Sequence, residues 1–360
     1  MTQPSWNRET VTLEEILAQP QRWMKCLQLL TQNGLVRQIC THVPEDAVWL
    51  FVGCGTSYYL ALSAAATFTA VTGMPARAVT ASDLLLFPNV VLNRRRTVIP
   101  VLISRSGKTT ETVHAAEFLE LERGIRTVAM TCTEGSALSG AVRFALILTP
   151  AAERSTVMTS SFTSMLLGLQ FLAGTFANDP AYLRGLSSAA AAVAPLVTPV
   201  ADRLRDFVAR YDFEDYVFLG QGPYYGIACE AALKVMESSC SYAQSFHTLE
   251  FRHGPKSIVS PRTLIGFFIS ESGKKQEVDL LEEIKGLGAT TLVVTSEADS
   301  RTRAAADFLV EVPGGLPEFC RPITYMPWAQ MLGVFTGLKK GLDPDSPRNL
   351  SQVVILSGTR

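Results

Sequence analysis

The chain has 360 residues, of which 47% are hydrophobic and 18% are charged, and its formal net charge is −1. This length accommodates two domains with cores of their own, and the composition excludes a disordered chain. The nearly neutral charge excludes a global electrostatic field that would attract nucleic acid or an anionic membrane, so a small anionic ligand would need a local binding site.

The amino-terminal sequence lacks the basic and then apolar pattern of a signal peptide. The most alanine-rich stretch, residues 187–197, is too short and too weakly apolar to span a bilayer. The seven cysteines are odd in number and include no Cys-x-x-Cys pair, which argues against a disulfide framework or a zinc site. We therefore expect a cytoplasmic protein with no membrane partner, no nucleic acid, no metal and no cofactor.

Strands and helices alternate along the first half of the chain. A leading helix is predicted over Glu14–Asn33. Short apolar runs predict strands over Ala47–Val52, Thr97–Ile103 and Arg126–Thr131, and a weaker one over Phe144–Leu148. Longer helical patterns follow most of them, at Tyr58–Val71, Thr109–Leu121 and Ser161–Phe176.

The second half repeats this alternation. Its predicted strands are Tyr216–Leu219, Leu264–Ile269 and Thr291–Val294, and its predicted helices are Tyr225–Ser238, Lys275–Lys285 and Trp328–Lys339. The pattern predicts an α/β fold with two tandem domains, each a mostly parallel sheet flanked by helices in a flavodoxin-like three-layer sandwich. The predicted segments are an N-terminal helix (1–40), a first domain (41–178), a linking helix (179–211), a second domain (212–342) and a C-terminal tail (343–360).

Three motifs recur in the same order, each displaced by a similar distance of about half the chain. Phe51–Tyr59 (FVGCGTSYY) recurs as Phe218–Gly226 (FLGQGPYYG), and Ile103–Lys108 (ISRSGK) recurs as Ile269–Lys274 (ISESGK). A glycine followed by a short apolar strand, at 124–131 and at 288–295, forms the third pair. One such match could arise by chance, whereas three in order indicate a duplicated domain.

Each Gly-x-Gly motif lies where a strand is predicted to turn into a helix. Ligands of doubly wound sheets bind there, beyond the carboxyl ends of the strands. Thr56 and Ser57 in the first motif are therefore candidate contacts to a sugar hydroxyl or a phosphate, as are Thr159 and Ser160, which precede another predicted helix. The alternative is that the glycines only form a tight turn.

A stronger indication of a ligand comes from Ser104–Thr110 (SRSGKTT), which follows an apolar strand and opens a helix. Backbone N–H groups at a helix N-terminus attract anions, and the hydroxyls of Ser104, Ser106, Thr109 and Thr110 can converge on one group. The spacing is not that of a nucleotide P-loop, so a sugar phosphate is favoured over ATP. Simple helix capping is the alternative. The second copy, Ser270–Gln276, has an acidic residue and no threonine, which predicts one phosphate site per chain.

Candidate acid–base residues follow the second glycine turn. Glu230, Lys234 and Glu237 are spaced to share one helical face, and His253 follows further on. A histidine can move a proton at the ring oxygen to open a pyranose, and a glutamate can carry a proton between C1 and C2. A lysine can tune that carboxylate or stabilise developing negative charge. The same spacing also occurs in ordinary ion pairs on exposed helices.

These motifs together resemble, almost from end to end, the family of phosphosugar isomerases with two tandem sugar-isomerase (SIS) domains. The resemblance is to the isomerase portion of glucosamine-6-phosphate synthase and to the AgaS-type ketose/aldose isomerase–deaminases. The tail Asp343–Leu350 looks more like the synthase branch. The other segments that match are Gly53–Ser57, Ile103–Thr109, Met158–Phe162, Glu230–Glu237 and Phe251–Ser257.

The resemblance implies roles for individual residues. It implies that Glu237 carries the C1–C2 proton with Lys234 beside it, and that His253 opens the ring across the interface of a homodimer with shared active sites. It also implies that Glu230 and Arg348 pair to anchor the tail over the site. The residues that it assigns to the sugar phosphate are Ser57, Ser104, Ser106 and Thr109.

The chain departs from the synthase pattern in two places. Residue 2 is Thr rather than a cysteine nucleophile, and no glutaminase domain precedes the repeat, so we expect no ammonia supply from glutamine. The synthase tail has a lysine that can form a Schiff base with a ketose, and the matching residue here is Gln352. Since an amide cannot form an imine, we expect His253 to open the ring directly.

The sequence therefore predicts an amino-sugar 6-phosphate isomerase–deaminase that acts on a hexose or hexosamine 6-phosphate. Plain aldose–ketose isomerisation and deglycation of a fructosamine 6-phosphate are alternatives that use the same residues. A non-catalytic sugar-phosphate sensor is an alternative from another class. It is disfavoured by the retention of Glu237 and His253, because a sensor needs no proton carriers.

Overall fold

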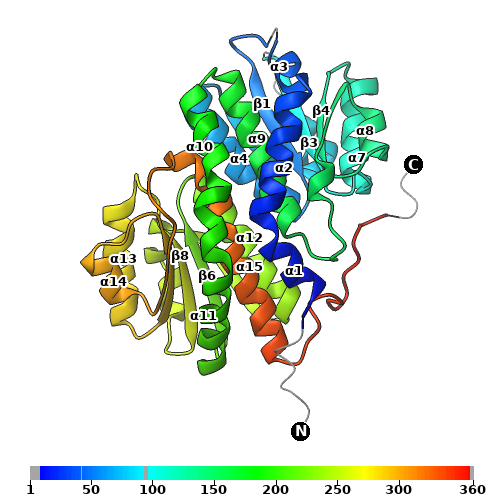
Figure 1. The fold of residues 1–360 in the computed structure, drawn as a ribbon. Helices are drawn as coiled ribbons and strands as arrows, with labels where there is room; N and C mark the ends of the chain where they lie inside the picture. Colours follow the sequence, from blue (N-terminus) through cyan, green and yellow to red (C-terminus); the bar gives the residue numbers. More distant parts are fainter. Residues whose placement is uncertain (1–8, 42, 93–95, 357–360) are drawn as a thin grey trace. The chain divides into compact units, whose positions relative to one another are not determined.

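The structure is a computed structural model that describes residues 9–41, 43–92 and 96–356. These residues form two compact units, each built around one sheet (Figure 1). Residues 1–8 and 357–360, which include Thr2 and the ends of the predicted N-terminal and tail segments, lie outside the described residues. The first-sheet unit comprises 21–153, 160–187 and 351–360, and the second-sheet unit comprises 1–20, 154–159 and 188–350.

The first-sheet unit contains a five-stranded parallel sheet with the order β2-β1-β3-β4-β5. This order is that of flavodoxin-like folds, in which the chain reverses its direction of travel across the sheet between β1 and β3. The fold class predicted for this half is confirmed. The strands are β1 (Val48–Gly53), β2 (Ala76–Thr80), β3 (Val98–Ile103), β4 (Val128–Thr131) and β5 (Phe144–Ile147).

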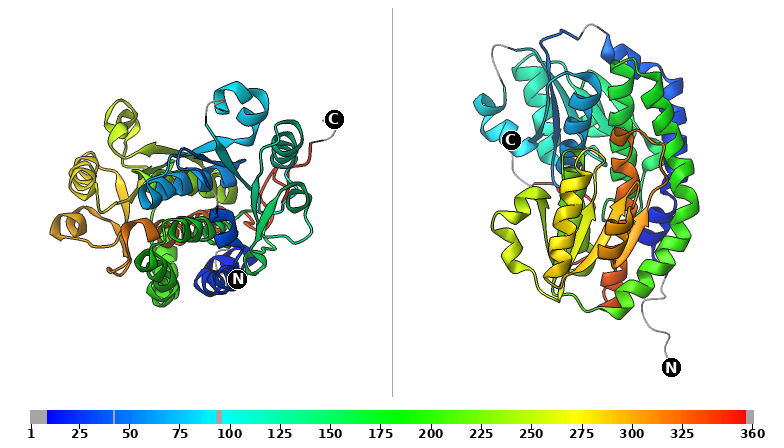
Figure 2. Two further views of the ribbon diagram at one scale, coloured as in Figure 1. Left: turned by 90° about the horizontal axis from the view of Figure 1, so that it is seen from above. Right: turned by 90° about the vertical axis from the view of Figure 1, so that its left-hand side faces the viewer.

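Helices cover both faces of this sheet (Figure 2). Leu50 and Val52 of β1 point to a core formed with α5, α7 and α8. The alternate residues Trp49 and Phe51 pack on Phe68 of α4, because successive side chains of a strand face opposite sides. The helices are α2 (Gln19–Gln32), α3 (Leu35–Cys40), α4 (Thr56–Thr72), α5 (Ala81–Leu86), α6 (Pro88–Val91), α7 (Thr110–Glu117), the π-helix η2 (Phe118–Glu122), α8 (Ala137–Ala141), η3 (Thr149–Ala151) and α9 (Ser160–Phe176).

The second-sheet unit repeats the topology, with five parallel strands in the order β10-β9-β8-β6-β7. Read from β7, this is the strand order of the first sheet, as expected for a duplicated domain. Val217 and Leu219 of β6 face a core formed with α13 and α14. The strands are β6 (Asp215–Gly220), β7 (Tyr242–His247), β8 (Thr263–Phe268), β9 (Thr290–Thr295) and β10 (Phe308–Glu311).

The helices of this unit include two that pack closely against one another, α12 and α15. Aromatic contacts such as Tyr224–Tyr325 join them. The helices are α1 (Val11–Leu17), α11 (Val197–Arg210), α12 (Pro223–Ser239), η5 (Leu249–Arg252), η6 (Pro255–Ile258), α13 (Lys274–Gly286), α14 (Ser300–Ala305), η7 (Glu318–Cys320) and α15 (Pro322–Lys339), and α10 (Pro180–Val193) runs from one unit into the other.

The leading helix predicted over Glu14–Asn33 is interrupted. α1 ends at Leu17 and α2 begins at Gln19. Pro20 lies in the first turn of α2, where its missing N–H group is tolerated, whereas inside one continuous helix it would remove a hydrogen bond. The proline therefore explains why two helices replace the predicted one.

The linking stretch Pro180–Arg210 is also divided, since the 3₁₀ turn η4 (Ala194–Leu196) separates α10 from α11. Taken as one stretch of 31 residues, it is long and apolar enough to cross a membrane by length and composition alone. The alanine-rich residues 187–197, taken alone, are too short to predict this longer apolar stretch. Buried residues recur every three or four positions along α10, as in a helix that packs one face on a protein core: Leu186, Ala189, Ala190 and Val193.

Two glycines allow α15 to approach α12 closely. A Cβ atom at Gly337 would lie 2.1 Å from the carbonyl oxygen of Ser238, and one at Gly333 would lie 2.8 Å from that of Lys234. We expect Gly337→Ala to lower the free energy of unfolding by about 1–3 kcal/mol, because helix backbones must separate. Urea unfolding checks this, with Gly286→Ala as the control, since a Cβ at Gly286 meets nothing within 4 Å. Equal stabilities of the two variants would contradict the prediction.

Candidate active site

The two Gly-x-Gly turns have the same backbone geometry. Gly55 has φ 53° and ψ −125°, and Gly222 has φ 54° and ψ −125°. These positive φ values favour glycine. The first glycine of each motif packs directly on the following helix, and a Cβ at Gly220 would lie 2.2 Å from the carbonyl oxygen of Tyr224. The turns therefore have a structural requirement for glycine in both units, whether or not a ligand binds.

In the first-sheet unit, the glycine turn lies next to the Ser104–Thr110 loop. β1 and β3 are hydrogen-bonded neighbours, with Val52 opposite Leu102, and each motif follows the end of its strand. Thr56 and Ser57 are the first residues of α4 and are buried. The structure thus brings Thr56 and Ser57 to the same sheet edge as the predicted phosphate loop, at the point where ligands of such folds bind.

The Ser104–Thr110 loop is a compact turn before α7. The hydroxyls of Ser104 and Thr109 lie 3.1 Å apart, and the N–H of Gly107 donates to Oγ of Ser104 at 3.2 Å. The N–H of Lys108 donates to Oγ of Ser106 at 3.1 Å. Gly107 has φ 61°, and a Cβ there would lie 2.2 Å from Oγ of Ser136. The loop brings the hydroxyls of Ser104 and Thr109 together before the N-terminus of α7, where backbone N–H groups can attract an anion, and phosphate binding at this loop stays a prediction.

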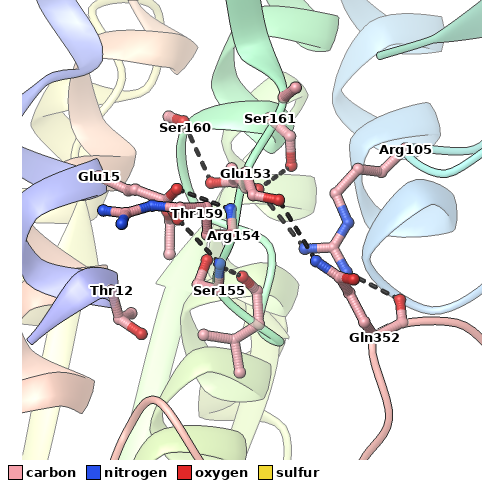
Figure 3. A network of polar contacts seen from close by, with 12 residues as sticks. Thr12, Glu15, Arg105, Glu153, Arg154, Ser155, Thr159, Ser160, Ser161 and Gln352 are labelled. Carbon is pink, nitrogen blue, oxygen red and sulfur yellow. Dashed lines mark hydrogen bonds and ion pairs between the residues drawn. The ribbon is translucent and has the colours of Figure 1, made fainter. Parts of the chain in front are cut away.

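Glu153 is a buried acidic residue near this loop that the sequence analysis did not identify. Its side chain is fully buried and accepts hydrogen bonds from the hydroxyls of Ser160, at 3.1 Å, and of Ser161. Nη1 of Arg105 lies 3.6 Å from the Glu153 carboxylate (Figure 3). Nη1 of Arg22 also donates to Oγ of Ser160, at 2.7 Å. The Ser160 hydroxyl is thus engaged within the protein, and its contact with substrate stays a prediction.

The segment 154–159 belongs to the second-sheet unit, and its backbone bonds to α1. The N–H groups of Arg154 and Ser155 donate to the carboxylate of Glu15 at 2.8 and 3.2 Å (Figure 3). Thr159 is buried, and its carbonyl oxygen accepts from the amide of Gln330 at 3.0 Å. The residues predicted as one pair, Thr159 and Ser160, therefore lie in different units.

The acid–base residues predicted on α12 form a buried triad. Nζ of Lys234 lies 3.2 Å from Oε1 of Glu230 and also pairs with the carboxylate of Glu237. Lys234 and Glu230 are buried almost completely, whereas the side chain of Glu237 is 18% exposed. Burial alone would lower the pKa of Lys234, but the Glu230 and Glu237 carboxylates outweigh it and raise that pKa. Lys234 therefore remains an ammonium, and Glu237 is the member of the triad that solvent can reach.

His253 and Arg348 are exposed. His253 follows η5, and its N–H donates to the carbonyl oxygen of Glu250 at 3.0 Å. Within the described part of the chain, no ion pair joins Glu230 to Arg348, because the buried Glu230 pairs with Lys234 instead. The predicted tail anchor through Arg348 is therefore not formed in this structure.

In the second-sheet unit, the loop that corresponds to Ser104–Thr110 is filled by carboxylates of the protein itself. Oε1 of Glu318 accepts from the N–H groups of Glu271 and Ser272 at 2.7 and 3.0 Å. The Glu277 carboxylate accepts from the N–H and the hydroxyl of Ser270 at 2.7 and 2.9 Å. These donors correspond to the groups expected to hold a phosphate in the first-sheet unit, and one phosphate site per chain stays a prediction.

Burial raises the pKa of Glu277 from 4.5 to about 7, although the hydrogen bonds that the N–H and the hydroxyl of Ser270 donate favour the carboxylate. Since the folded-state pKa exceeds the unfolded one, the charged form destabilises the fold above pH 7, and this penalty disappears as the pH falls towards 4.5. We expect Glu277→Gln to raise the free energy of unfolding at pH 8 by at most about 3 kcal/mol, and to change it little at pH 5. Urea unfolding at both pH values checks this, and a gain independent of pH would contradict it.

Within residues 9–41, 43–92 and 96–356, no group of three His, Cys, Asp or Glu side chains could hold a metal ion. The chemistry that the side chains themselves offer is anion binding in the first-sheet unit and proton transfer in the second. The seven cysteines are free thiols. Burial raises the pKa of Cys54, which follows the first glycine of its turn, so it is a poor nucleophile.

Comparison with known proteins identifies the family. The SIS domain matches residues 49–174 and 213–332, which cover more than half of the chain and both sheets. The glutamine–fructose-6-phosphate aminotransferase (isomerizing) of Methanothermobacter thermautotrophicus is 25% identical over 98% of this chain. The chain spans only 56% of that protein's length. The AgaS protein of Escherichia coli K12, whose name proposes D-galactosamine-6-phosphate deaminase activity, is 27% identical over 94% of this chain and 91% of its own.

Solved structures agree with these relatives. Glucosamine-6-phosphate deaminase from Thermotoga maritima superposes with a TM-score of 0.79 at 29% identity, covering 96% of this chain and 100% of that one. Tagatose-6-phosphate ketose/aldose isomerase from Escherichia coli superposes with a TM-score of 0.86 at 25% identity, covering 97% of each chain. The duplicated sheets, the glycine turns and the matched residues lead to one conclusion: the chain belongs to the tandem SIS-domain family of phosphosugar isomerases.

Proposed function

We propose that the protein is an amino-sugar 6-phosphate isomerase–deaminase of the cytoplasm. The observation that carries the proposal is the Lys234–Glu237 pair, in which a buried ammonium contacts a carboxylate that solvent can reach. A glutamate held in this way can accept and return a proton during aldose–ketose isomerisation. The hydroxyls of Ser104, Ser106 and Thr109, with Ser57, bind the phosphate in this proposal. Relatives of nearly equal length are named as amino-sugar phosphate deaminases, which supports the substrate class.

The reaction begins with ring opening, in which His253 transfers the proton between the C1 hydroxyl and the ring oxygen of a hexosamine 6-phosphate. Glu237 then removes the proton from C2 of the open-chain aldehyde and returns a proton to C1. The product carries an imine at C2. Water adds to this imine, and the carbinolamine loses ammonia and leaves a ketose 6-phosphate. Lys234 stabilises the negative charge that develops at the oxygen during enolisation.

The test is release of ammonia from glucosamine 6-phosphate and from galactosamine 6-phosphate by the purified protein, measured in a coupled assay. Release from either sugar is expected. If neither releases ammonia while a hexose 6-phosphate is isomerised, the plain isomerase alternative replaces the deaminase. Release of an amine from a fructosamine 6-phosphate would support the deglycase alternative. Binding of these sugars without turnover would support a sensor and overturn the proposed enzyme.

We also propose that the protein acts as a homodimer in which His253 serves the active site of the second copy. The exposure of His253 supports this, because an exposed side chain directly after a short 3₁₀ segment can reach a partner. Mixing inactive His253→Ala and inactive Glu237→Gln proteins should restore part of the activity if sites are shared. No recovery in the mixture, or elution from gel filtration as a monomer only, would contradict shared sites.

A further inference from the structure

The C-terminal segment Ser351–Leu356, called here the tail, lies against the phosphate loop of the first-sheet unit. Nη2 of Arg105 donates to the carbonyl oxygen of Gln352 at 2.8 Å. The N–H of Thr110 donates to the carbonyl oxygen of Val354 at 3.4 Å, and the N–H of Leu356 donates to Oγ1 of Thr110 at 3.0 Å. The tail therefore contacts the residues on both sides of the loop's glycine.

Hydrophobic burial contributes little to holding the tail in this place. The side chains of Val354, Ile355 and Leu356 are 53%, 70% and 45% exposed. Polar contacts must therefore supply most of the attraction. Among the contacts just described, the bond from the Arg105 guanidinium is charge-assisted, and such bonds are roughly twice as strong as those between neutral groups. Arg105 thus makes the strongest of these contacts with the tail.

On the side away from the tail, the guanidinium of Arg105 faces the carboxylate of Glu153. The Glu153 carboxylate, fully buried, lies 3.6 Å from Nη1 of Arg105, and Arg105 itself is only 8% exposed. Ser160 and Ser161 at the N-terminus of α9 donate to the same carboxylate. A carboxylate at this end of a helix is favoured by the helix dipole. Figure 3 shows the guanidinium between Glu153 and the tail at Gln352.

We propose that Arg105 is a positioning residue that holds the tail against the phosphate loop, and that Glu153 acts through Arg105 by fixing the direction of its guanidinium. The side chain of Arg105 is turned towards Glu153 and the tail, so it contributes to substrate binding through the tail. The contribution of Arg105 to substrate binding rests on the proposed function, whereas its contact with the tail does not.

Amide hydrogen exchange of the full chain tests the proposal. Arg105→Gln should speed exchange of the Leu356 amide about tenfold or more, because loss of a charge-assisted bond releases the tail. Glu153→Gln should speed it less, and should add nothing in an Arg105→Gln background. The control is Arg143→Gln, which removes an exposed arginine of the same unit and should match the wild type. Unchanged exchange in Arg105→Gln, or additive effects in the double variant, would overturn the proposal.

A second variant and a second readout keep the test decisive. If Arg105→Gln does not fold, Arg105→Lys keeps the charge but cannot direct two planar donor groups to Glu153 and Gln352, so the same faster exchange is expected. For any phosphosugar that the wild type converts, Arg105→Gln should raise KM about tenfold with a smaller change in kcat. Absence of turnover in the wild type would contradict the proposed function and leave the exchange result to decide this inference.

Discussion

Replacing Glu237 by glutamine should lower kcat for phosphosugar conversion at least about a hundredfold while the protein remains folded. The amide has nearly the shape of the carboxylate but cannot accept a proton from C2. The Glu237 side chain is 18% exposed, so the burial of its charge costs less free energy than that of the fully buried Glu230. Neutralising Glu237 should therefore change the stability of the fold less than neutralising Glu230. KM should change less than kcat, because the substitution removes a proton carrier and leaves the phosphate contacts in place.

The matched control is Glu214→Gln, which removes another carboxylate of the second-sheet unit. Glu214 is exposed and pairs with Arg262, so its loss should leave both activity and stability nearly unchanged. Turnover numbers and thermal melting of both variants separate a catalytic effect from a structural one. A Glu237→Gln protein with wild-type kcat would assign the proton transfer to another group and overturn the proposed mechanism.

The central strands of both sheets could be predicted from the sequence, whereas three edge strands could not. β8 and β9 are buried at every position, and such strands read as continuous apolar runs. β2, β7 and β10 lie at sheet edges and are only partly buried. An edge strand such as Tyr242–His247 (YAQSFH) tolerates polar residues, so it lacks the apolar run by which the others were identified.

The candidate binding and acid–base residues could be found from local sequence patterns, whereas the residues that hold their surroundings in place could not. The loop Ser104–Thr110 and the spacing of Glu230, Lys234 and Glu237 follow from local rules for helix ends and helix faces. Glu153 follows η3 in a segment without any motif, and its partner Arg105 is 48 positions away. Only the fold brings such a pair together, and a single carboxylate in a loop gives no indication of its burial.

The loop Ser270–Gln276 of the second-sheet unit, whose donors bind Glu318 and Glu277, could also be predicted only in part. Its acidic residue and missing threonines predict the loss of an anion site. The sequence does not show that Glu318, from the segment before α15, takes the donors of Glu271 and Ser272. Backbone N–H groups before a helix have no acceptor within that helix, so water, a ligand or a side chain must accept from them. A carboxylate of the protein meets this requirement without a ligand.

Lys234→Met should combine a large loss of stability with a loss of activity. Removing the ammonium leaves the fully buried Glu230 carboxylate without its counter-charge, and breaking a buried ion pair in this way costs about 3–5 kcal/mol. Glu237 also loses the cation that holds its carboxylate in place, so kcat should fall even at temperatures where the variant is folded. Urea unfolding and steady-state kinetics measure the two effects separately.

The double variant Lys234→Met/Glu230→Met separates the structural part of the triad from the catalytic part. Replacing both members of a buried pair by apolar residues of similar volume is often neutral or stabilising, so the double variant should recover most of the stability lost in Lys234→Met. Its activity should stay low, because Glu237 still has no ammonium beside it.

Lys285→Met is the control, since its partner Asp307 is partly exposed and the pair contributes little. A double variant no more stable than Lys234→Met would show that Glu230 is not buried as a counter-charge to Lys234. Recovery of activity together with stability would show that Lys234 stabilises the helix and takes no part in the reaction.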